Sequence, residues 1–375
     1  MSSQKIRFQR PLLPSAAATE RYLAAAREAR WFSNAGPCWH LLRERLSAAV
    51  GCDCVPVVNA TLGLIVALAA VVGRTVRPGR SALVPSFAFA ASAQAAVWNG
   101  LEPVFVDVDA DHWHLAPAAL ERALSRLDGE VAVVIALSSF GTPPPVPVRL
   151  EWERLCADAH VPLVVDSAAG FGAEAADGVR VGTQGDVEVV SFHAVKPFGI
   201  GEGGAVFTRD TELAAEILRL TEFAFDEHKQ AARMNGINAK LSEYSAAVAL
   251  AAMDDYENVL RARRSAAFQL LSLLPEEFRP QLEHERGTWQ FVPVAAPSPA
   301  ARREILETAG SSVELRTYYD PLHLMPAFVD CRRADNLAVT ADLGERMLSL
   351  PMAADLTRDE IAAVAEAVRA ALRPK

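Results

Sequence analysis

Short apolar runs alternate with longer, mostly helical segments along the chain between about residues 16 and 223. The short runs are rich in Val, Leu and Ile and have the length of buried strands. We predict strands over 55–58, 82–84, 103–106, 131–137, 162–165, 187–190 and 205–208, and helices over 16–30, 38–50, 61–72, 88–99, 118–127, 150–159 and 211–223. This alternation predicts an α/β fold with a parallel or mostly parallel sheet between helices.

The pattern becomes less regular after residue 223, and a polar, glycine-bearing break covers 234–238. We predict one long helix over 241–263, a strand near 288–292, a helix over 300–308, a strand over 313–316 and a closing helix over 357–372. This mixture is typical of an α+β unit. We therefore expect residues 1–240 to form a large domain and residues 241–375 a smaller C-terminal α+β domain.

Composition narrows the classes of protein. Of the 375 residues, 51% are hydrophobic and 22% are charged, which is ordinary for a globular enzyme. The net charge of -9 argues against a nucleic-acid partner, because phosphate backbones attract basic surfaces. The longest apolar stretch, 62–72, is too short to span a membrane. The five cysteines are odd in number and scattered, which favours reduced thiols in a cytoplasmic protein over a disulfide framework.

Polar residues follow several of the predicted strands. Ligands of open parallel sheets bind beyond the carboxyl ends of the strands, so these residues are candidates for a ligand site. They are Asn59, Thr61, Ser86, Asp107, Ser138 and Asp166.

One lysine, Lys196, lies between the apolar runs 187–190 and 205–208. Burial of an ammonium group is costly unless the amine is paired or used chemically, and it lowers the pKa toward the neutral amine that carbonyl chemistry requires. A cluster of glycines follows Lys196 and leads into a strand rather than a helix. This position argues against a dinucleotide fingerprint and favours a tight turn that brings backbone close to a ligand. The glycines are Gly199, Gly201, Gly203 and Gly204.

Lys196, Asp166 and the Asn-Ala-Thr turn at 59–61 together form the set that pyridoxal 5′-phosphate (PLP) requires. A lysine forms the Schiff base, an aspartate pairs with the pyridinium nitrogen, and a helix N-terminus binds the phosphate. Taken singly, the lysine is more often a surface residue and the aspartate a strand-end turn residue.

Sequence motifs in the same order extend this set over nearly the whole chain. With them, the chain resembles the DegT–StrS family of sugar aminotransferases, which are PLP enzymes of fold type I. Each motif alone is weak, whereas their order and spacing are specific. They cover 59–64, 84–92, 103–109, 166–172, 185–186, 191–196, 201–204, 236–243 and 319–323.

The resemblance implies a role for each matching residue. Lys196 would carry the Schiff base and Asp166 would pair with the pyridine nitrogen. Phe89 and Ala168 would pack on opposite faces of the cofactor ring, although a core position is the common one for such an aromatic residue. The phosphate would be bound by residues from two elements, namely Ala60, Thr61 and Ser191.

The resemblance also implies a homodimer with shared active sites, because Asn238 matches a residue that reaches the neighbouring subunit's phosphate. Tyr319 and His323 match a segment near the substrate entrance, where either could be structural. One departure concerns Ala169, since many family members carry His or Gln at this position near the cofactor's phenolic oxygen.

The reaction implied by the resemblance moves an amino group from an amino acid, glutamate being the usual donor, to a ketosugar attached to a nucleotide. Three alternatives stay open: a PLP-dependent sugar dehydratase, an enzyme like the aminohydroxybenzoate synthases, and a non-catalytic PLP-fold regulator. Dehydratase relatives replace the Schiff-base lysine by histidine. The presence of Lys196, with Asp166 and Ser191, therefore favours the aminotransferase.

Overall fold

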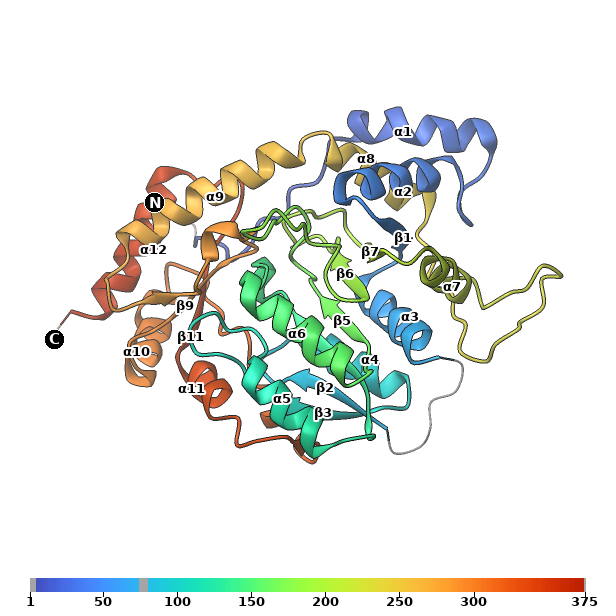
Figure 1. Cartoon of the computed structure of the whole chain (residues 1–375). Helices are drawn as coiled ribbons and strands as arrows, with labels where there is room; N and C mark the ends of the chain where they lie inside the picture. The colour runs from blue at the N-terminus through green and yellow to red at the C-terminus, as the bar shows by residue number, and fades with distance from the viewer. Residues whose placement is uncertain (1–4, 74–79, 374–375) are drawn as a thin grey trace.

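The computed structural model describes residues 5–73 and 80–373, and it confirms the α/β fold with a mostly parallel central sheet between helices (Figure 1). The sheet has eight strands in the order β1-β7-β6-β5-β4-β2-β3-β10. They are β1 (Asp53–Val57), β2 (Ser81–Pro85), β3 (Glu102–Val106), β4 (Val131–Leu137), β5 (Leu163–Asp166), β6 (Val187–Ser191), β7 (Gly204–Thr208) and β10 (Arg332–Arg333). The strands from β6 to β10 in this order run parallel, and β7 is antiparallel to both β6 and β1.

The described part of the chain contains twelve α-helices. They are α1 (Ala16–Ala29), α2 (Pro37–Val50), α3 (Ala60–Val72), α4 (Ala90–Trp98), α5 (Pro117–Arg126), α6 (Val146–Asp158), α7 (Thr211–Thr221), α8 (Glu243–Met253), α9 (Tyr256–Leu273), α10 (Pro299–Ala309), α11 (Ala338–Arg346) and α12 (Arg358–Ala371).

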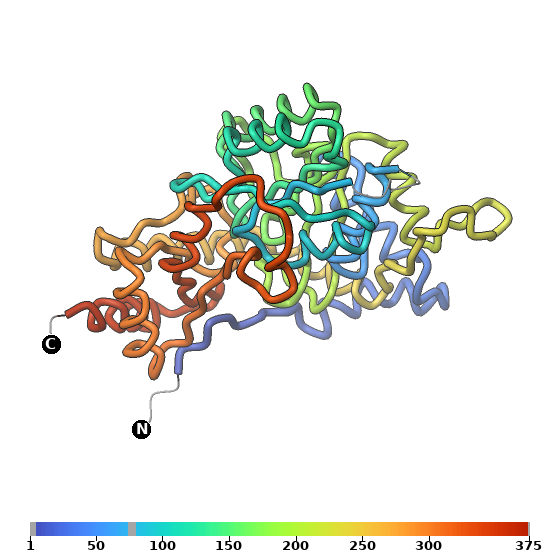
Figure 2. The backbone as a smooth tube through the Cα atoms, turned by 90° about the horizontal axis from the view of Figure 1, so that it is seen from below, coloured from blue at the N-terminus to red at the C-terminus, as the bar shows by residue number. Residues whose placement is uncertain are grey.

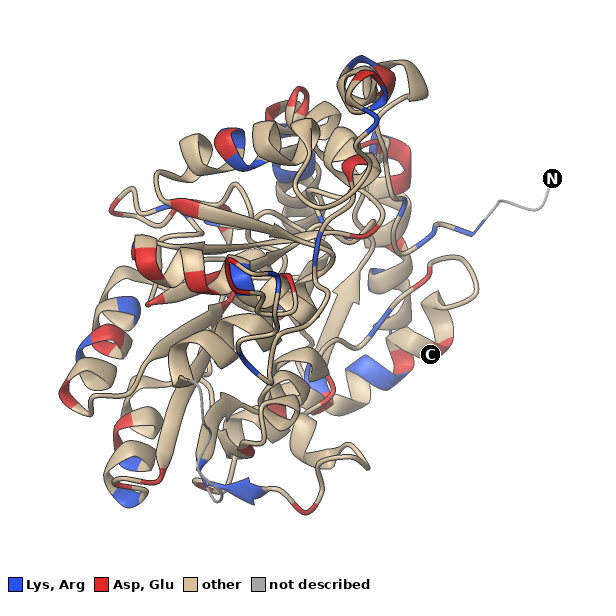
Figure 3. Cartoon of the chain, turned by 90° about the vertical axis from the view of Figure 1, so that its right-hand side faces the viewer, with Lys and Arg blue, Asp and Glu red and all other residues tan. Residues whose placement is uncertain are grey.

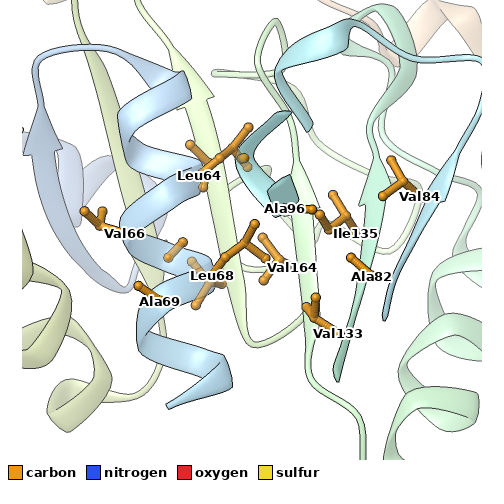
Figure 4. Close-up of a cluster of buried hydrophobic side chains, with 14 of the residues drawn as sticks. Leu64, Val66, Leu68, Ala69, Ala82, Val84, Ala96, Val133, Ile135 and Val164 are labelled. Carbon is orange, nitrogen blue, oxygen red and sulfur yellow. The ribbon is translucent and has the colours of Figure 1, made fainter. Parts of the chain in front are cut away.

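Both faces of the central sheet are buried. Val133 and Ile135 of β4 belong to a core that includes α3, α4 and α7, whereas Val134 and Ala136 belong to a core with α5 and α6. This follows from the alternation of side chains along a strand. Figure 4 shows Leu68 of α3 close to the strands of the first core. Burial on both faces explains why these strands read as continuous apolar runs.

A second, three-stranded sheet has the order β11-β9-β8. It consists of β8 (Arg279–Pro280), β9 (Val292–Ala295) and β11 (Met347–Leu350), and it shares a core with α9, α10 and α12. The strand predicted near 288–292 is found a few residues later, as β9. The strand predicted over 313–316 is wrong, because Val313 and Arg316 form only isolated bridges to Ile6 and Ser349. Neither α11 nor β11 was predicted, since short elements depend on tertiary packing.

The long helix predicted over 241–263 is also wrong, because α8 and α9 are separate helices. The break falls at Asp254 and Asp255, whose side chains compete for backbone hydrogen bonds and favour helix ends. The Asp254 carboxylate accepts hydrogen bonds from Arg21, Tyr22 and Arg45 at 3.1, 2.9 and 3.0 Å. These contacts with α1 and α2 hold the end of α8 in place.

The division into domains of residues 1–240 and 241–375 stays a proposal, and packing contacts cross it. Leu250 of α8 shares a core with Leu23 of α1 and Leu42 of α2. Phe8, near the start of the described chain, packs in the core of the C-terminal part. Figure 2 shows the N-terminal segment running beside the C-terminal helices before it reaches α1.

A segment between Glu222 and Asn238 extends away from the body beside α7 (Figures 1 and 2). Antiparallel bridges join Glu222 to Asn238 and Phe225 to Ala231, so the segment folds back on itself. Met234 on this segment is fully exposed. On the face of the molecule nearest this segment, charged residues of both signs are interspersed (Figure 3). In the described part of the chain, no helix combines the length and the apolar character that a membrane span requires.

Candidate active site

The N-terminus of α3 provides open backbone N–H groups at the carboxyl end of β1. Asn59 caps the helix, and its side-chain oxygen accepts a hydrogen bond from the N–H of Leu62 at 2.9 Å. The first N–H groups of an α-helix have no acceptor within the helix, which leaves those of Ala60 and Thr61 for a ligand. They also lie at the positive end of the helix dipole, which favours an anion.

Gly204 brings Ser191 close to this helix start. It pairs with Ser191 of β6 on one side and with Val57 of β1 on the other. A Cβ atom on residue 204 would lie only 2.9 Å from the backbone nitrogen of Ala60, so glycine is required for this approach. Ser191 therefore lies near the N-terminus of α3, where its hydroxyl and the N–H groups of Ala60 and Thr61 suit a phosphate group.

Asp166 is buried at the carboxyl end of β5, with 5% of its surface exposed. Ser92 of α4 donates a hydrogen bond to its carboxylate at 2.6 Å, and the N–H of Ala168 donates another at 3.1 Å. Burial raises the pKa of Asp166, whereas the Ser92 bond, the charge of Lys196 and the Ala168 bond lower it. A cationic partner such as a pyridinium N–H would further favour the ionised form of this carboxylate.

Lys196 lies on a short loop between β6 and β7. The N–H of Lys196 donates to the carbonyl of His193 at 2.8 Å, and the N–H of Ala194 donates to the carbonyl of Gly201 at 2.7 Å. Gly201 has a φ of 106°, a conformation that favours glycine. Gly201 therefore allows a tight turn within the loop that carries Lys196. The position of the glycines before a strand predicted such a turn.

The Lys196 amine has a lowered pKa. Burial lowers this pKa from its ordinary value to about 8, and the opposite charge of Asp166 acts against the shift. The amine donates a hydrogen bond to the side-chain oxygen of Gln290 at 3.1 Å. An amine with a pKa near 8 is neutral in a sizeable fraction of molecules near neutral pH and can attack a carbonyl carbon.

The two predicted ring-contacting residues lie on elements that are bonded to Asp166. Ala168 is bonded to the carboxylate through its N–H, and its carbonyl accepts from the N–H of Ser191 at 3.1 Å. Phe89 is the N-cap residue of α4, one turn before Ser92, and its side chain is 58% exposed. An aromatic residue exposed to this extent is not a core residue. Its role against the cofactor ring stays a prediction.

Tyr319 and His323 make contacts with other residues of the fold. The Tyr319 ring is stacked on Phe140 with centroids 4.7 Å apart, and burial followed by the charge of Asp166 raises its pKa. His323 is buried, and its Nδ1 lies 2.8 Å from the hydroxyl of Ser86 at the end of β2. This bond fixes the segment around His323 to the sheet. A substrate contact from either residue stays a prediction.

Asn238 pairs with Glu222 through an antiparallel bridge. It is exposed, at the base of the protruding segment, and the neighbouring carbonyl of Ala239 accepts from the N–H of Val58 at 2.8 Å beyond the end of β1. Its predicted role in a neighbouring subunit's site is taken up below.

Sequence reasoning missed two residues of the site. Ser92 lies within a motif that we recognised, and its position one turn after the start of a helix next to a strand end was an available signal. Gln290 had no such signal, because 94 residues separate it from Lys196. Asp107 turned out to be structural: its carboxylate accepts from the N–H groups of Val339 and Thr340 at 3.0 and 2.8 Å at the start of α11.

The residues present fit PLP at its phosphate, its ring nitrogen and its aldehyde. The α3 N-terminus and Ser191 suit its phosphate, the Asp166 carboxylate suits its ring nitrogen, and the Lys196 amine suits its aldehyde. All of them lie at the carboxyl edge of the central sheet. The fold and this site define a PLP-dependent aminotransferase of fold type I.

Comparison with known proteins gives the family. The family model described as the DegT/DnrJ/EryC1/StrS aminotransferase family matches residues 15–369. The chain belongs to this family, as the sequence motifs predicted, and it is a sugar aminotransferase that uses PLP.

Individual relatives are similar over nearly their whole length. Protein Rv3402c of Mycobacterium tuberculosis (strain ATCC 25618 / H37Rv) is 34% identical, with 98% of this chain and 90% of that protein covered. The dTDP-4-amino-4,6-dideoxy-D-glucose transaminase of Shigella dysenteriae is 26% identical, with 96% and 97% covered. The crystal structure of DesI in the presence of its TDP-sugar product superposes with a TM-score of 0.89 at 29% identity, covering 99% of this chain and 94% of DesI.

Proposed function

We propose that this enzyme transfers the amino group of glutamate to a ketosugar that is attached to a nucleoside diphosphate. The single observation that carries the proposal is that the Lys196 amine, the buried Asp166 carboxylate and the open N–H groups of α3 lie at one edge of the central sheet. The nucleotide-linked sugars in the names of the Shigella transaminase and of DesI support this class of acceptor.

Each residue has a defined task in this proposal. PLP, when bound, supplies the electron sink for the exchange of an amino group against a carbonyl group. Asp166 keeps the ring nitrogen protonated through its negative charge. Lys196 carries the proton that must leave one carbon atom and reach another, because an amine with a pKa of about 8 can both accept and return a proton near neutral pH.

The acceptor can be identified with the enzyme in its pyridoxamine 5′-phosphate form. We expect that one member of a panel of dTDP-, UDP- and GDP-linked ketosugars will restore the visible absorbance of the PLP–lysine Schiff base. Mass spectrometry should show the matching amino sugar. Glutamate should then return the enzyme to the pyridoxamine form and release 2-oxoglutarate, whereas glutamine and alanine serve as donor controls.

Other outcomes of this experiment separate the alternatives. Loss of water from the sugar without gain of nitrogen would indicate a dehydratase. Reaction only with a cyclic, non-sugar ketone would indicate an enzyme like the aminohydroxybenzoate synthases. Purified protein that binds no PLP at all would favour a regulatory protein.

We further propose a cytoplasmic homodimer in which Asn238 completes the partner's phosphate site. The five free cysteines support the location. The protruding segment supports the dimer, because its exposed Met234, Phe223 and Phe225 are costly to leave in water. The amide of Asn238 can donate to a phosphate oxygen without adding charge.

Mixing two defective variants tests this arrangement. Lys196→Ala and Asn238→Ala chains, unfolded together and refolded, should form heterodimers that place both defects in one site and leave the other site intact. Activity should therefore rise above that of either variant alone, toward about a quarter of the wild-type value if chains pair at random in equal amounts.

The structure offers a matched control for the mixing experiment. Lys196 and Asp166 belong to one site of one chain, so mixing Lys196→Ala with Asp166→Asn leaves one defect in each site and should restore nothing. Equal failure of both mixtures, or a fully active monomer in solution, would contradict the shared site.

A further inference from the structure

Gln290 meets the Lys196 amine although it comes from a distant part of the chain. It lies just before β9 in the C-terminal part, its side chain is 8% exposed, and its Oε1 accepts from the amine at 3.1 Å. The contact therefore joins the C-terminal part of the chain to the loop that carries the lysine.

The backbone around Gln290 is held firmly from two directions. The hydroxyl of Thr288 donates to the carbonyl of Ala169 at 2.6 Å, next to the strand-end turn of Asp166. The guanidinium of Arg263, buried in α9, donates to the carbonyl of Trp289 at 2.9 Å. Because residues 288 and 289 are both bonded, the backbone from which the Gln290 side chain reaches the lysine is held in place.

A primary amide suits an amine that must change its protonation state. Its oxygen accepts a hydrogen bond from the ammonium ion and from the neutral amine alike. It carries no charge, so it does not hold the lysine in the ammonium form, as a carboxylate at the same distance would. An alkyl side chain of the same size would leave the amine without this acceptor. Asp166, at the carboxyl end of the neighbouring strand β5, is the charged group that acts on the amine.

We propose that Gln290 is a positioning residue that holds the free amine of Lys196 whenever the lysine is detached from the cofactor. The held amine stays within reach of the carbon atoms between which it carries the proton. This inference rests on the proposed role of Lys196.

The test measures the titration of the amine rather than turnover. Full-length enzyme in the pyridoxamine phosphate form, in which the lysine is free, is treated with trace acetic anhydride across a pH series. Acetylation of Lys196 is quantified by mass spectrometry against the exposed Lys229. A variant that loses the cofactor is compared with wild-type protein that has been stripped of it.

Two substitutions should move the titration in opposite directions. Gln290→Glu should raise the midpoint for Lys196 by about one unit or more and reduce its acetylation at pH 8 by several-fold, because a carboxylate next to an ammonium favours the charged form. Gln290→Leu should lower the pH midpoint for Lys196, because the ammonium ion makes the stronger hydrogen bond to the amide oxygen and loses more when that acceptor is removed. General damage to the fold would not produce opposite shifts.

Gln281→Leu is the matched control. Gln281 is also a buried glutamine of the C-terminal part, but its side chain donates to the carbonyl of His112 at 2.7 Å. It should leave the Lys196 titration unchanged. If both Gln290 variants also leave it unchanged, the inference is overturned.

The proposed role of Lys196 fails by a different measurement. If borohydride still fixes PLP covalently to Lys196→Ala protein, another lysine is attached to the cofactor, whatever the Gln290 variants show. If Lys196→Ala abolishes this attachment and Gln290→Glu does not shift the titration, only the role of Gln290 is rejected.

Discussion

Replacement of Lys196 by alanine should abolish turnover while PLP stays bound without a covalent link. The α3 N-terminus and Ser191 remain to bind the phosphate, and Asp166 remains to pair with the ring nitrogen. The variant loses both the covalent attachment and the proton carrier, and positioned proton transfer alone contributes about 100-fold to 10,000-fold. Absorbance, borohydride reduction and single-turnover assays with glutamate would measure these losses separately.

Two controls distinguish lost chemistry from a lost fold. Lys229→Ala removes an exposed lysine of the protruding segment and should leave single-turnover rates unchanged. Added methylamine should partly restore proton transfer to Lys196→Ala, because a small amine fits the space left by the side chain. Near-normal transamination by Lys196→Ala without added amine would reject the assignment.

Replacement of Asp166 by asparagine should lower the rate by roughly 100-fold or more. Asparagine keeps the shape of the side chain and can still accept from the N–H of Ala168, but it has no charge to hold a proton on the ring nitrogen. A charge-assisted hydrogen bond worth about 3 kcal/mol corresponds to roughly a 100-fold change in rate. Single-turnover rates of the PLP form with glutamate would measure it.

Ser92→Ala provides the matched control for Asp166. It removes one of the hydrogen bonds to the carboxylate and keeps the charge, so its effect should be much smaller than that of Asp166→Asn. It should raise the pKa of Asp166, because the Ser92 bond stabilises the ionised form. An Asp166→Asn enzyme that is nearly as active as the parent would mean that another residue protonates the ring.

The local sequence pattern was sufficient to predict most strands and helices of the proposed large domain, residues 1–240. Buried parallel strands are uniform apolar runs because both faces of the sheet are covered. Some of the helices also end at typical stop residues, as α3 does at Gly73 and α4 at Asn99. After residue 240 the same pattern predicted helices α10 and α12 correctly, but it missed the break between α8 and α9 and misplaced the strands. The helix break at Asp254 depends on Arg21, Tyr22 and Arg45, which come from helices more than 200 residues earlier.

The polar residues at the strand ends also show what local sequence can and cannot predict. Asp107 and Asp166 follow similar strands and both end in carboxylates, yet Asp107 caps α11 whereas Asp166 faces Lys196 and Ser92. The sequence motif around Asp166 singled it out, but the physical difference is which element packs beyond each strand.

The sequence by itself therefore determined the fold class, the cofactor chemistry and the family, because these depend on short-range patterns: strand and helix periodicity, a lysine beside a glycine turn, and ordered motifs. Tertiary structure decided how the site is completed. Gly204 brings Ser191 to the start of α3, and Gln290 reaches the Lys196 amine across 94 residues of sequence. Such contacts arise from the packing of distant elements, and no local spacing encodes them.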